Sequence, residues 1–445
     1  MKLLLKGARV VDPASGIDGI RDVLVDGDRI SRVDTSIPAG AAAGARIVEL
    51  GSSLVVVPGL IDMHVHLREP GYEHKETVAT GTASAVAGGF TAVACMPNTN
   101  PVNDNASVTR FILKQSVAAD LARVYPIGAV SNGSNGEQLA EIADMREAGC
   151  VAFSDDGRPV ATAALMRRAL EYAGMFNMPI IDHCEDRSLA CDGVAHESFV
   201  TGQLGLRGIP SAAEDVMVDR DIVLAAMTGS AVHIAHLSTQ GALRSVREGK
   251  SRGVRVTCEV TPHHFTLTDA RLQAPLAYDT HLKMNPPLRE PHDRDALIEG
   301  LRDGSVDVIA TDHAPHHADE KNVEFDRAPF GIVGLETAVS LGLDRLVHAG
   351  IIGLPRFVDL MSVAPARIIG VAGGRLAQGD VADITILAPD LDVTVTASGF
   401  RSKSRNTPFD GWTLRGGVAA TFVGGRPLFV NAAVAAVASL TRSRQ

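Results

Sequence analysis

The chain has few cysteines, few aromatic residues and no excess of positive charge. Its 445 residues include one tryptophan, four tyrosines and five cysteines, and the formal net charge is −10. An odd and sparse cysteine count without a CxxC pair favours reduced thiols over a disulfide framework. Proteins that bind nucleic acid usually carry a basic face, so the acidic balance argues against such a partner. The cysteines are Cys95, Cys150, Cys184, Cys191 and Cys258.

Long apolar segments are also missing. No run approaches the roughly 20 residues that cross a bilayer. The first residues, MKLLLKGARVVDP, have only a very short apolar run and no small-residue cleavage site. We therefore expect no membrane span, no signal peptide and a cytoplasmic location. Hydrophobic residues make up 45% of the chain, which is typical of a globular protein, and the length suffices for one large domain and a smaller one.

Both ends of the chain have the pattern of short strands separated by turns. Three such stretches lie near the start and two near the end, with glycine and aspartate at the turns. We predict that residues 1–55 and 370–430 pair into one small β-sandwich domain, with residues 56–369 inserted between them. Residues 431–445 are expected to form a terminal helix or tail.

The middle of the chain alternates between apolar β-type runs and helical patterns. Helical stretches such as ATAALMRRALEYAGMF separate most of the runs. Alternation of strand and helix predicts an α/β protein with a parallel sheet, and eight runs predict a (β/α)8 barrel of the TIM type. The runs cover residues 55–66, 90–97, 124–131, 150–156, 179–186, 231–238, 255–264 and 307–316.

Ionisable residues lie at the ends of six of these eight runs, and those of five runs form one candidate set. In a TIM barrel the carboxyl ends of all strands open onto one face, where active sites lie, so these residues should converge. His64 and His66 point to the same side of a strand because side chains alternate. Taken alone, such a pair has the equally simple reading of two histidines near a turn. The strand-end residues are His64, His66, Asp155, Asp156, His183, His236 and Asp312.

This set of side chains predicts a metal site. It offers imidazole nitrogens and carboxylate oxygens without cysteine, which suits Zn²⁺ and similar divalent ions. It also holds more ligands than one tetrahedral ion needs, so we predict a catalytic site with one or two zinc ions that activate water. Two ions need an anionic bridge. Because no lysine occurs in residues 115–249, Asp155 or Asp156 takes the place of the carbamylated lysine that some barrel hydrolases use.

Seven short motifs resemble the signature of the dihydroorotases, of the bacterial type that often associates with aspartate carbamoyltransferase. They are DMHVHLREPG, MPNTNP, AFSDDGRPV, DHCED, HIAHLS, MNPPLR and ATDHAPH. The likeness extends over nearly the whole chain, including the split β-domain of cyclic amidohydrolases. It favours Asp156 as the bridge, with Asp155 as the alternative. It implies two ligand sets that share one carboxylate: His64, His66, Asp156 and Asp312, and Asp156, His183 and His236.

The same resemblance implies a set of substrate-binding residues. Arg68, two residues after His66, would grip the carboxylate of dihydroorotate with its planar fork. The alternative for this arginine is a surface ion pair with Glu69 or Glu73. The other implied contacts are Asn98, Asn285 and His316 through their side chains, and Phe330 and Gly331 through their backbone.

The implied reaction is the reversible ring opening of (S)-dihydroorotate to N-carbamoyl-L-aspartate, a step of pyrimidine (UMP) biosynthesis. Asp312 is the implied catalytic residue, which takes a proton from the attacking hydroxide and passes it to the leaving ring nitrogen. One alternative is another cyclic amidohydrolase (dihydropyrimidinase, hydantoinase or allantoinase), most of which use the lysine that this chain lacks. The other is a non-catalytic scaffold for aspartate carbamoyltransferase. The expected partners are the small-molecule substrate, that transcarbamoylase and further copies of the chain.

The remaining histidines are expected to lie outside the metal set. His233 comes three residues before His236, so on a strand it faces the other way and is predicted to be structural. His263 and His264 end the seventh run and could line the pocket. Three further histidines are expected at surface or loop positions: His74, His196 and His281.

Overall fold

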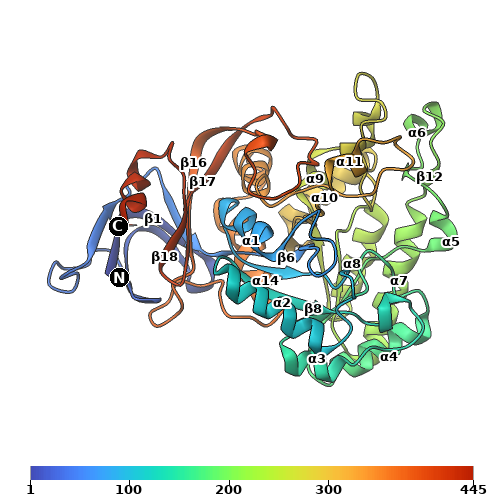
Figure 1. The fold of residues 1–445 in the computed structure, drawn as a ribbon, viewed down its shortest axis with the longest axis horizontal. Helices are drawn as coiled ribbons and strands as arrows, with labels where there is room; N and C mark the ends of the chain where they lie inside the picture. The colour runs from blue at the N-terminus through green and yellow to red at the C-terminus, as the bar shows by residue number, and fades with distance from the viewer. Residues whose placement is uncertain (1, 444–445) are drawn as a thin grey trace.

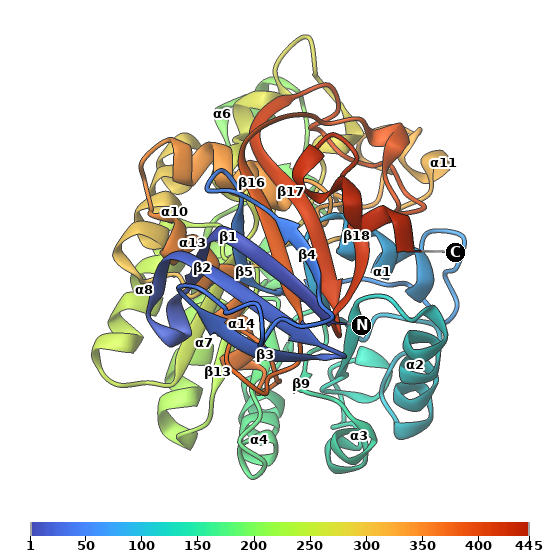
Figure 2. The same cartoon turned by 90° about the vertical axis from the view of Figure 1, so that its left-hand side faces the viewer.

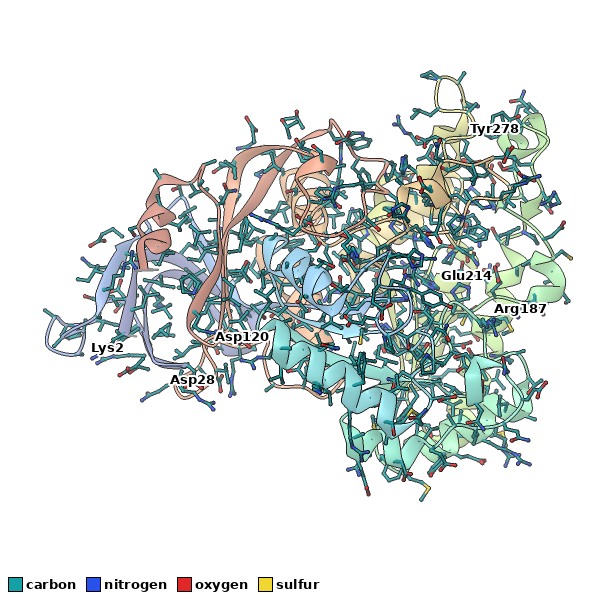
Figure 3. The ribbon with its side chains drawn as sticks, in the orientation of Figure 1. Lys2, Asp28, Asp120, Arg187, Glu214 and Tyr278 are labelled. Atoms are coloured by element: carbon teal, nitrogen blue, oxygen red, sulfur yellow. The ribbon has the colours of Figure 1, made fainter. Side chains whose placement is uncertain are left out.

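The computed structural model describes residues 2–443, which form a barrel half and a sheet half (Figure 1). The first and last described segments lie side by side in the sheet half, as Figures 1 and 2 both show. Lys2 and Asp28 mark the sheet half in Figure 3, and Glu214 and Tyr278 mark the barrel half. The chain therefore starts in the sheet, builds the barrel and returns to the sheet.

Eight parallel strands form the barrel, which confirms the predicted fold. They are hydrogen-bonded in the order β15-β14-β13-β10-β9-β8-β7-β6. A parallel bridge between Val65 and His313 brings the segment after β15 beside β6 and nearly closes the ring. The strands are β6 Leu60–Val65, β7 Phe90–Cys95, β8 Arg123–Gly128, β9 Ala152–Phe153, β10 Ile180–Asp182, β13 Val232–Ile234, β14 Val256–Val260 and β15 Val308–Ile309.

Helices follow the barrel strands and surround the barrel (Figure 2). Several begin at a residue whose side-chain oxygen accepts a backbone N–H of the first turn, as Thr77, Asn105 and Thr162 do. None of the helices in the described part of the chain is long and apolar enough to cross a membrane. The main helices are α1 Val78–Ala87, α2 Ala106–Ala119, α3 Ile142–Ala148, α4 Ala163–Gly174, α7 Ala212–Thr228, α8 Gln240–Ser251 and α10 Pro291–Asp303.

Shorter elements decorate the loops at the strand ends and complete the ring. After β15, three short helices are joined by π-helical turns and lead back toward the sheet half. The short helices are α5 Arg187–Ala190, α6 Phe199–Gln203, α9 Pro262–Thr266, α11 Ala318–Lys321, α12 Ala338–Gly342, α13 Leu354–Val358 and α14 Ala364–Ile368. The two-stranded pair β11 Ala195–His196 and β12 Gly208–Ile209 lies in the connection between β10 and α7.

The sheet half is one hydrogen-bonded sheet that combines both ends of the chain. Its strands follow the order β18-β17-β16-β5-β1-β2-β3, with β4 paired to β1. It has its own apolar core, in which Leu3, Val25, Ile384 and Phe422 are fully buried. A 3₁₀ helix, Ala435–Ser443, follows the last strand. The predicted domain boundaries at residues 55 and 370 stay predictions. The strands are β1 Lys2–Asp12, β2 Ile17–Asp26, β3 Arg29–Asp34, β4 Arg46–Glu49, β5 Val55–Pro58, β16 Ile384–Thr394, β17 Thr413–Val423 and β18 Arg426–Val430.

The first predicted barrel run, residues 55–66, is two strands instead of one. Its first part, β5, belongs to the sheet half, and its second part, β6, opens the barrel. Gly59 lies at the change, where its N–H donates to the carbonyl of Asp383 at 2.9 Å. A Cβ atom at Gly59 would lie 2.2 Å from Oγ1 of Thr91. Only glycine therefore lets the chain pass from the sheet to the barrel so closely.

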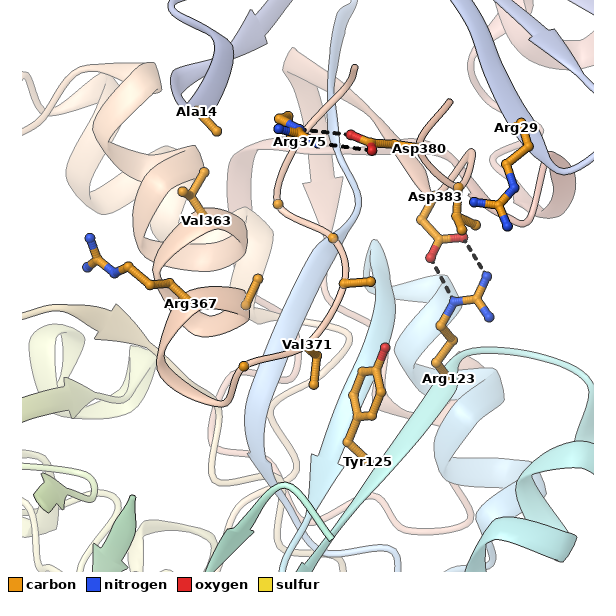
Figure 4. A pocket seen from close by; sticks show the side chains of 16 residues that line it. Ala14, Arg29, Arg123, Tyr125, Val363, Arg367, Val371, Arg375, Asp380 and Asp383 are labelled. Atoms are coloured by element: carbon orange, nitrogen blue, oxygen red, sulfur yellow. Dashed lines mark hydrogen bonds and ion pairs between the residues drawn. The ribbon is translucent and has the colours of Figure 1, made fainter. Parts of the chain in front are cut away.

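Two bidentate ion pairs lie at the junction between the two halves (Figure 4). Arg123 binds Asp383 at 2.8 and 3.1 Å, and Arg375 binds Asp380 at 2.9 and 3.1 Å. The four side chains line a hollow of about 620 Å³ together with Tyr125. Because Arg123 begins β8, this junction is at the amino ends of the strands, opposite the face where barrel active sites lie.

Candidate active site

All six predicted metal ligands lie at the carboxyl ends of barrel strands. His64 is within β6 and His66 follows it, whereas the other four follow β9, β10, β13 and β15. Each of the six is between 0% and 7% exposed. Strands from around the ring therefore deliver these side chains to one buried place. The other four are Asp156, His183, His236 and Asp312.

Asp156 lies at the centre of the cluster. Its Oδ1 is 3.4 Å from Nε2 of His236, 3.5 Å from Nε2 of His64 and 3.7 Å from Nδ1 of His183. Its Oδ2 is 3.5 Å from Nε2 of His66. One carboxylate therefore faces imidazoles from three strands, which is the position that a ligand shared between two ions requires.

Asp312 contacts the two histidines at the carboxyl end of β6, His64 and His66. Its Oδ1 is 2.9 Å from Nε2 of His66 and 3.5 Å from Nε2 of His64. On the other side, Nδ1 of His183 is 2.8 Å from Nε2 of His236. Within each of two groups of three residues, the potential ligand atoms all lie within 4.8 Å of one another. The first group is His64, Asp156 and His236, and the second is His64, His66 and Asp312.

Three buried polar atoms of this cluster have no hydrogen-bond partner among residues 2–443. They are Nε2 of His64, Oδ1 of Asp156 and Nδ1 of His236. A buried polar atom without a partner costs about 1–3 kcal/mol, and such atoms call for a missing ligand. The donors are nitrogen and oxygen only, as zinc and related divalent ions accept. The residues therefore fit a divalent metal ion.

The electrostatics of the cluster keep its two carboxylates charged. Burial raises the pKa of Asp156, but the neighbouring His64 and His236 outweigh this effect and hold the pKa well below its usual value. For Asp312, burial is likewise outweighed by the hydrogen bond with His66, so its pKa is also lowered. Both carboxylates are thus ionised at neutral pH, the form in which a carboxylate binds metal or accepts a proton.

Asp155, the alternative bridge, is committed to the backbone. It accepts hydrogen bonds from the N–H of Val130 at 2.9 Å, from the N–H of Ser131 at 3.0 Å and from Oγ of Ser131 at 2.5 Å. These bonds hold the loop after β8 against the loop after β9. Of the two aspartates, only Asp156 faces the histidines.

Glu259 is a residue of this site that the sequence reasoning missed. It is fully buried in β14, and its Oε1 accepts a hydrogen bond from Nδ1 of His64 at 2.5 Å and from the N–H of His236 at 3.2 Å. Its Oε2 is 3.2 Å from Nε2 of His233. A carboxylate that binds one ring nitrogen of a histidine fixes the tautomer, so that the other nitrogen is free for metal. The only signal in the sequence is an acidic residue within the apolar run RVTCEV.

The backbone is strained at three residues of the site. Arg68, His236 and Asp312 have φ angles of 62°, 30° and 47°, in the left-handed region that disfavours bulky side chains. Each such residue costs on the order of 1–3 kcal/mol and persists only where the surroundings impose it. All three lie at or just beyond strand ends. Three of the eight non-glycine residues with positive φ in residues 2–443 therefore lie where side chains turn toward the cluster.

Arg68 does not form the surface ion pair that was its alternative reading. Its Nε donates to the carbonyl of Pro315 at 3.3 Å. The carboxylates of Glu69 and Glu73 instead accept the N–H groups of Val78 and Gly71, at 2.8 Å each. The guanidinium is thus held beside the segment that follows Asp312, and burial lowers its pKa despite the nearby carboxylates.

The two predicted asparagines contact the ligand cluster directly. Oδ1 of Asn98 is 2.9 Å from Nδ1 of His66, so this side chain orients a predicted metal ligand. Nδ2 of Asn285 donates to Oε1 of Glu185 at 2.9 Å and lies 3.4 Å from Nε2 of His183. Both amides therefore lie at the edge of the cluster, with their orientation set by these partners.

His316, Phe330 and Gly331 form a separate wall of the site. Nε2 of His316 donates to the carbonyl of Phe330 at 2.9 Å. Burial and the positive charge of Arg68 hold the pKa of His316 far below its usual value, so the ring is neutral. Gly331 has a φ of 141°, and an added Cβ would lie 2.8 Å from the carbonyl oxygen of Ala314.

Comparison with known proteins decides the family. A "Dihydro-orotase-like" family model matches residues 53–242. A protein named dihydroorotase from Pelotomaculum thermopropionicum is 57% identical over 426 residues, which cover 96% of this chain and 98% of that protein. Another from Geobacter sulfurreducens is 53% identical over 425 residues, with 96% and 98% covered. The chain belongs to the dihydroorotase family. The resemblance inferred from the motifs is confirmed.

Solved structures show the same fold outside the dihydroorotase family. The chain matches an L-hydantoinase (dihydropyrimidinase) from Arthrobacter aurescens with a TM-score of 0.84 and 23% identity, over 96% of this chain and 95% of that one. It matches a dihydropyrimidinase from Brevibacillus agri with a TM-score of 0.81 and 21% identity, over 97% and 95%. At this identity the likeness concerns the fold, a barrel combined with a sheet from both chain ends.

Three further histidines are buried beside the predicted metal ligands: His233, His263 and His264. His233 is buried and binds Thr257 and Glu259. His264 binds Thr261 and the carbonyl of Pro286, whereas Nε2 of His263 is buried without a partner in residues 2–443.

The prediction of a surface or loop position for His196 is wrong. It is 4% exposed in β11, where it accepts a hydrogen bond from Nη1 of Arg289 at 3.1 Å. That arginine also pairs with Glu214, which Figure 3 labels in the barrel half. His74, by contrast, has a side chain that is 54% exposed, as expected.

We expect Glu259→Gln to weaken metal binding while the fold is retained. The amide can no longer accept the proton of His64 and His233 together, so the tautomer of His64 is no longer fixed. Loss of such a carboxylate partner typically costs about 10- to 100-fold in metal affinity. Metal affinity should be measured by competition with a chelator. The matched control is Glu299→Gln on α10, whose side chain is 45% exposed. Equal affinities for both variants and the wild type would contradict the role of Glu259.

Proposed function

We propose that this chain is a metal-dependent dihydroorotase that interconverts (S)-dihydroorotate and N-carbamoyl-L-aspartate. The observation that carries the proposal is the buried cluster of six potential ligands with Arg68 beside it. Relatives named dihydroorotase, 51–57% identical over nearly the full length, support it. The absence of lysine from residues 115–249 separates the cluster from sites bridged by a carbamylated lysine.

In this proposal the metal is zinc, with one or two ions per chain. His64, His66 and Asp312 would hold one ion, His183 and His236 would hold the other, and Asp156 would bridge them. A divalent ion bound there supplies Lewis-acid polarisation of the ring carbonyl and lowers the pKa of water to roughly 7.

The protein's own residues have separate tasks in the proposed reaction. Asp312 accepts the proton of the attacking water and donates it to the leaving ring nitrogen, which is general acid–base catalysis. Its Oδ1 is already within 2.9 Å of His66, so the carboxylate is fixed in the cluster. Arg68 binds the substrate carboxylate with two parallel N–H groups. Asn98, Asn285, His316 and the backbone of Phe330 and Gly331 orient the ring.

The proposed reaction is the ring-forming step of pyrimidine biosynthesis when it runs toward dihydroorotate. The proposal includes a cytoplasmic location. It also includes aspartate carbamoyltransferase and further copies of the chain as partners. These partners follow from the resemblance of the motifs and stay predictions of the proposal.

The first test measures metal content together with carbamoyl-aspartate cyclisation. We expect one to two zinc ions per purified chain, loss of activity when a chelator removes them, and recovery when zinc is added back. The reason is that the proposed reaction needs a metal ion bound to the cluster, whose His64, Asp156 and His236 each have a buried atom without a hydrogen-bond partner in residues 2–443. Full activity in a sample verified as metal-free would refute the mechanism.

The second test concerns Asp312. Asparagine keeps the shape and can still bind metal weakly, but it cannot accept a proton. We expect Asp312→Asn to lower kcat by at least ~10²-fold, the usual range for removal of a general base. Binding of an inert product analogue should change much less. A kcat within a few-fold of the wild type would show that Asp312 is not the general base.

The third test concerns Arg68 and separates dihydroorotate from uncharged rings. A bidentate charged contact in a partly buried pocket contributes on the order of 1.5–3 kcal/mol. Arg68→Met keeps much of the bulk and deletes the charge, so kcat/KM for dihydroorotate should fall roughly 10- to 150-fold.

The control for the Arg68 test is turnover of dihydrouracil, which lacks the carboxylate. Any slow turnover of this compound should be unchanged in Arg68→Met, with the same metal content as the wild type. Equal losses on both substrates would show that Arg68 supports the site in general. Such a result would contradict the binding of the substrate carboxylate by Arg68.

A further inference from the structure

Two lysines next to the site are buried without an acidic partner. Lys283 is 2% exposed and Lys321 is 3% exposed, and neither forms an ion pair with a carboxylate within residues 2–443. Burial lowers the pKa of Lys283 to about 8 and that of Lys321 to about 7. Burial of a charge without a counter-charge is unfavourable, and buried charges are normally paired with an opposite charge. Because these two lysines form no ion pair within residues 2–443, their burial needs another explanation.

Each of the two ammonium groups donates to at least one backbone carbonyl of the segment 325–331. Nζ of Lys283 donates to the carbonyls of Phe325 and Asp326 at 2.8 and 3.0 Å. Nζ of Lys321 donates to the carbonyl of Pro329 at 2.8 Å, and to those of Thr280 and Lys283 at 3.0 and 3.3 Å. The three carbonyls around Lys321 match the three N–H donors of its charged form, because a neutral amine has only two.

The same segment, residues 325–331, is held at its far end by two more side chains. His316 donates to the carbonyl of Phe330 at 2.9 Å, and Nδ2 of Asn406 donates to that of Gly331 at 3.0 Å. The N–H of Gly331 in turn donates to the carbonyl of Lys283 at 2.9 Å. Nζ of Lys283 also lies 4.7 Å from the centre of the Phe330 ring, within the range of a cation–π contact. We call residues 325–331 the tethered loop.

We propose that Lys283 and Lys321 are positioning residues that hold the tethered loop so that the backbone of Phe330 and Gly331 meets the substrate. This inference rests on the proposed function, which assigns substrate contacts to those two residues. Bonds from lysine to carbonyls fix the main chain, whereas ion pairs would fix only side-chain ends. No carboxylate forms an ion pair with either amino group within residues 2–443, although Asp326 near Lys283, and Asp279 and Glu320 near Lys321, oppose the lowering of the two pKa values.

Lys321→Met tests the proposal because methionine keeps the length and apolar stem and removes the three donors. We expect KM for dihydroorotate to rise about tenfold, since the loop must then be ordered on binding. We expect kcat and metal content to stay within about twofold of the wild type, because no metal ligand is touched. The matched control is Lys250→Met on α8, whose ammonium donates to the carbonyl of Ser305 at 2.7 Å but also pairs with Asp307. Its KM should not change.

Hydrogen exchange of the tethered loop in the substrate-free enzyme tests the clamp without reference to the reaction. We expect faster exchange within residues 325–331 in Lys321→Met and unchanged exchange in Lys250→Met. If the wild type had no dihydroorotase activity, this measurement would still decide whether the clamp exists. If Lys321→Met does not fold, Lys283→Met removes two bonds to the same loop and carries the same test.

Two results would overturn the proposal. Unchanged exchange of residues 325–331 in a folded Lys321→Met protein would show that the lysines do not hold the loop. Faster exchange with an unchanged KM, or a joint fall of kcat, metal content and stability, would show that the lysines are only structural. Faster exchange with a raised KM alone supports the positioning role.

Discussion

The buried negative charge of Asp156 is the constraint on which the rest of the site depends. A carboxylate that is 3% exposed cannot remain ionised in a protein interior without positive charge or a bound cation close by. The structure surrounds it with four imidazoles, each within 3.7 Å. These imidazoles come from three different strands, so only a scaffold in which strand ends converge can supply them. The barrel is that scaffold, and the orphaned ring nitrogens indicate where a cation completes the balance.

Buried carboxylates near this site differ in role because their partners differ. Asp155 is turned to backbone N–H groups and joins two loops. Asp156, its neighbour in the chain, is turned to imidazoles. Glu259 lies behind the cluster and binds the ring nitrogen of His64 that faces away from Asp156. Burial alone raises the pKa of a carboxyl group, and in Glu259 the adjacent His64 and His233 reverse that effect. The partners of each carboxylate therefore decide whether it faces the imidazoles, fixes the orientation of one of them or holds the backbone.

Much of this arrangement could be predicted from strand ends, and the rest could not for identifiable reasons. An apolar run that ends in histidine or aspartate is visible in the sequence, and parallel strands bring such ends together. Glu259 lies within its strand, so no local pattern distinguishes it from a solvent-facing residue. The split of residues 55–66 depends on close packing of Gly59 against Thr91, which lies in another strand. The burial of His196 depends on Arg289, almost a hundred residues away. Each of these three features is set by a contact distant in sequence.

The two ends of the barrel differ in how their charged side chains are paired. At the amino ends, Arg123 and Arg375 are each paired with an aspartate in bidentate geometry. At the carboxyl ends, Arg68, His236 and Asp312 have strained backbones. Within residues 2–443, Lys283 and Lys321 bind backbone carbonyls and form no ion pair with a carboxylate. Unsatisfied and strained groups are destabilising, so a fold that contains them must be stabilised elsewhere. The groups that the protein leaves incomplete at the carboxyl ends are the atoms of His64, Asp156 and His236 without a partner in residues 2–443, and these are the atoms that a metal ion can complete.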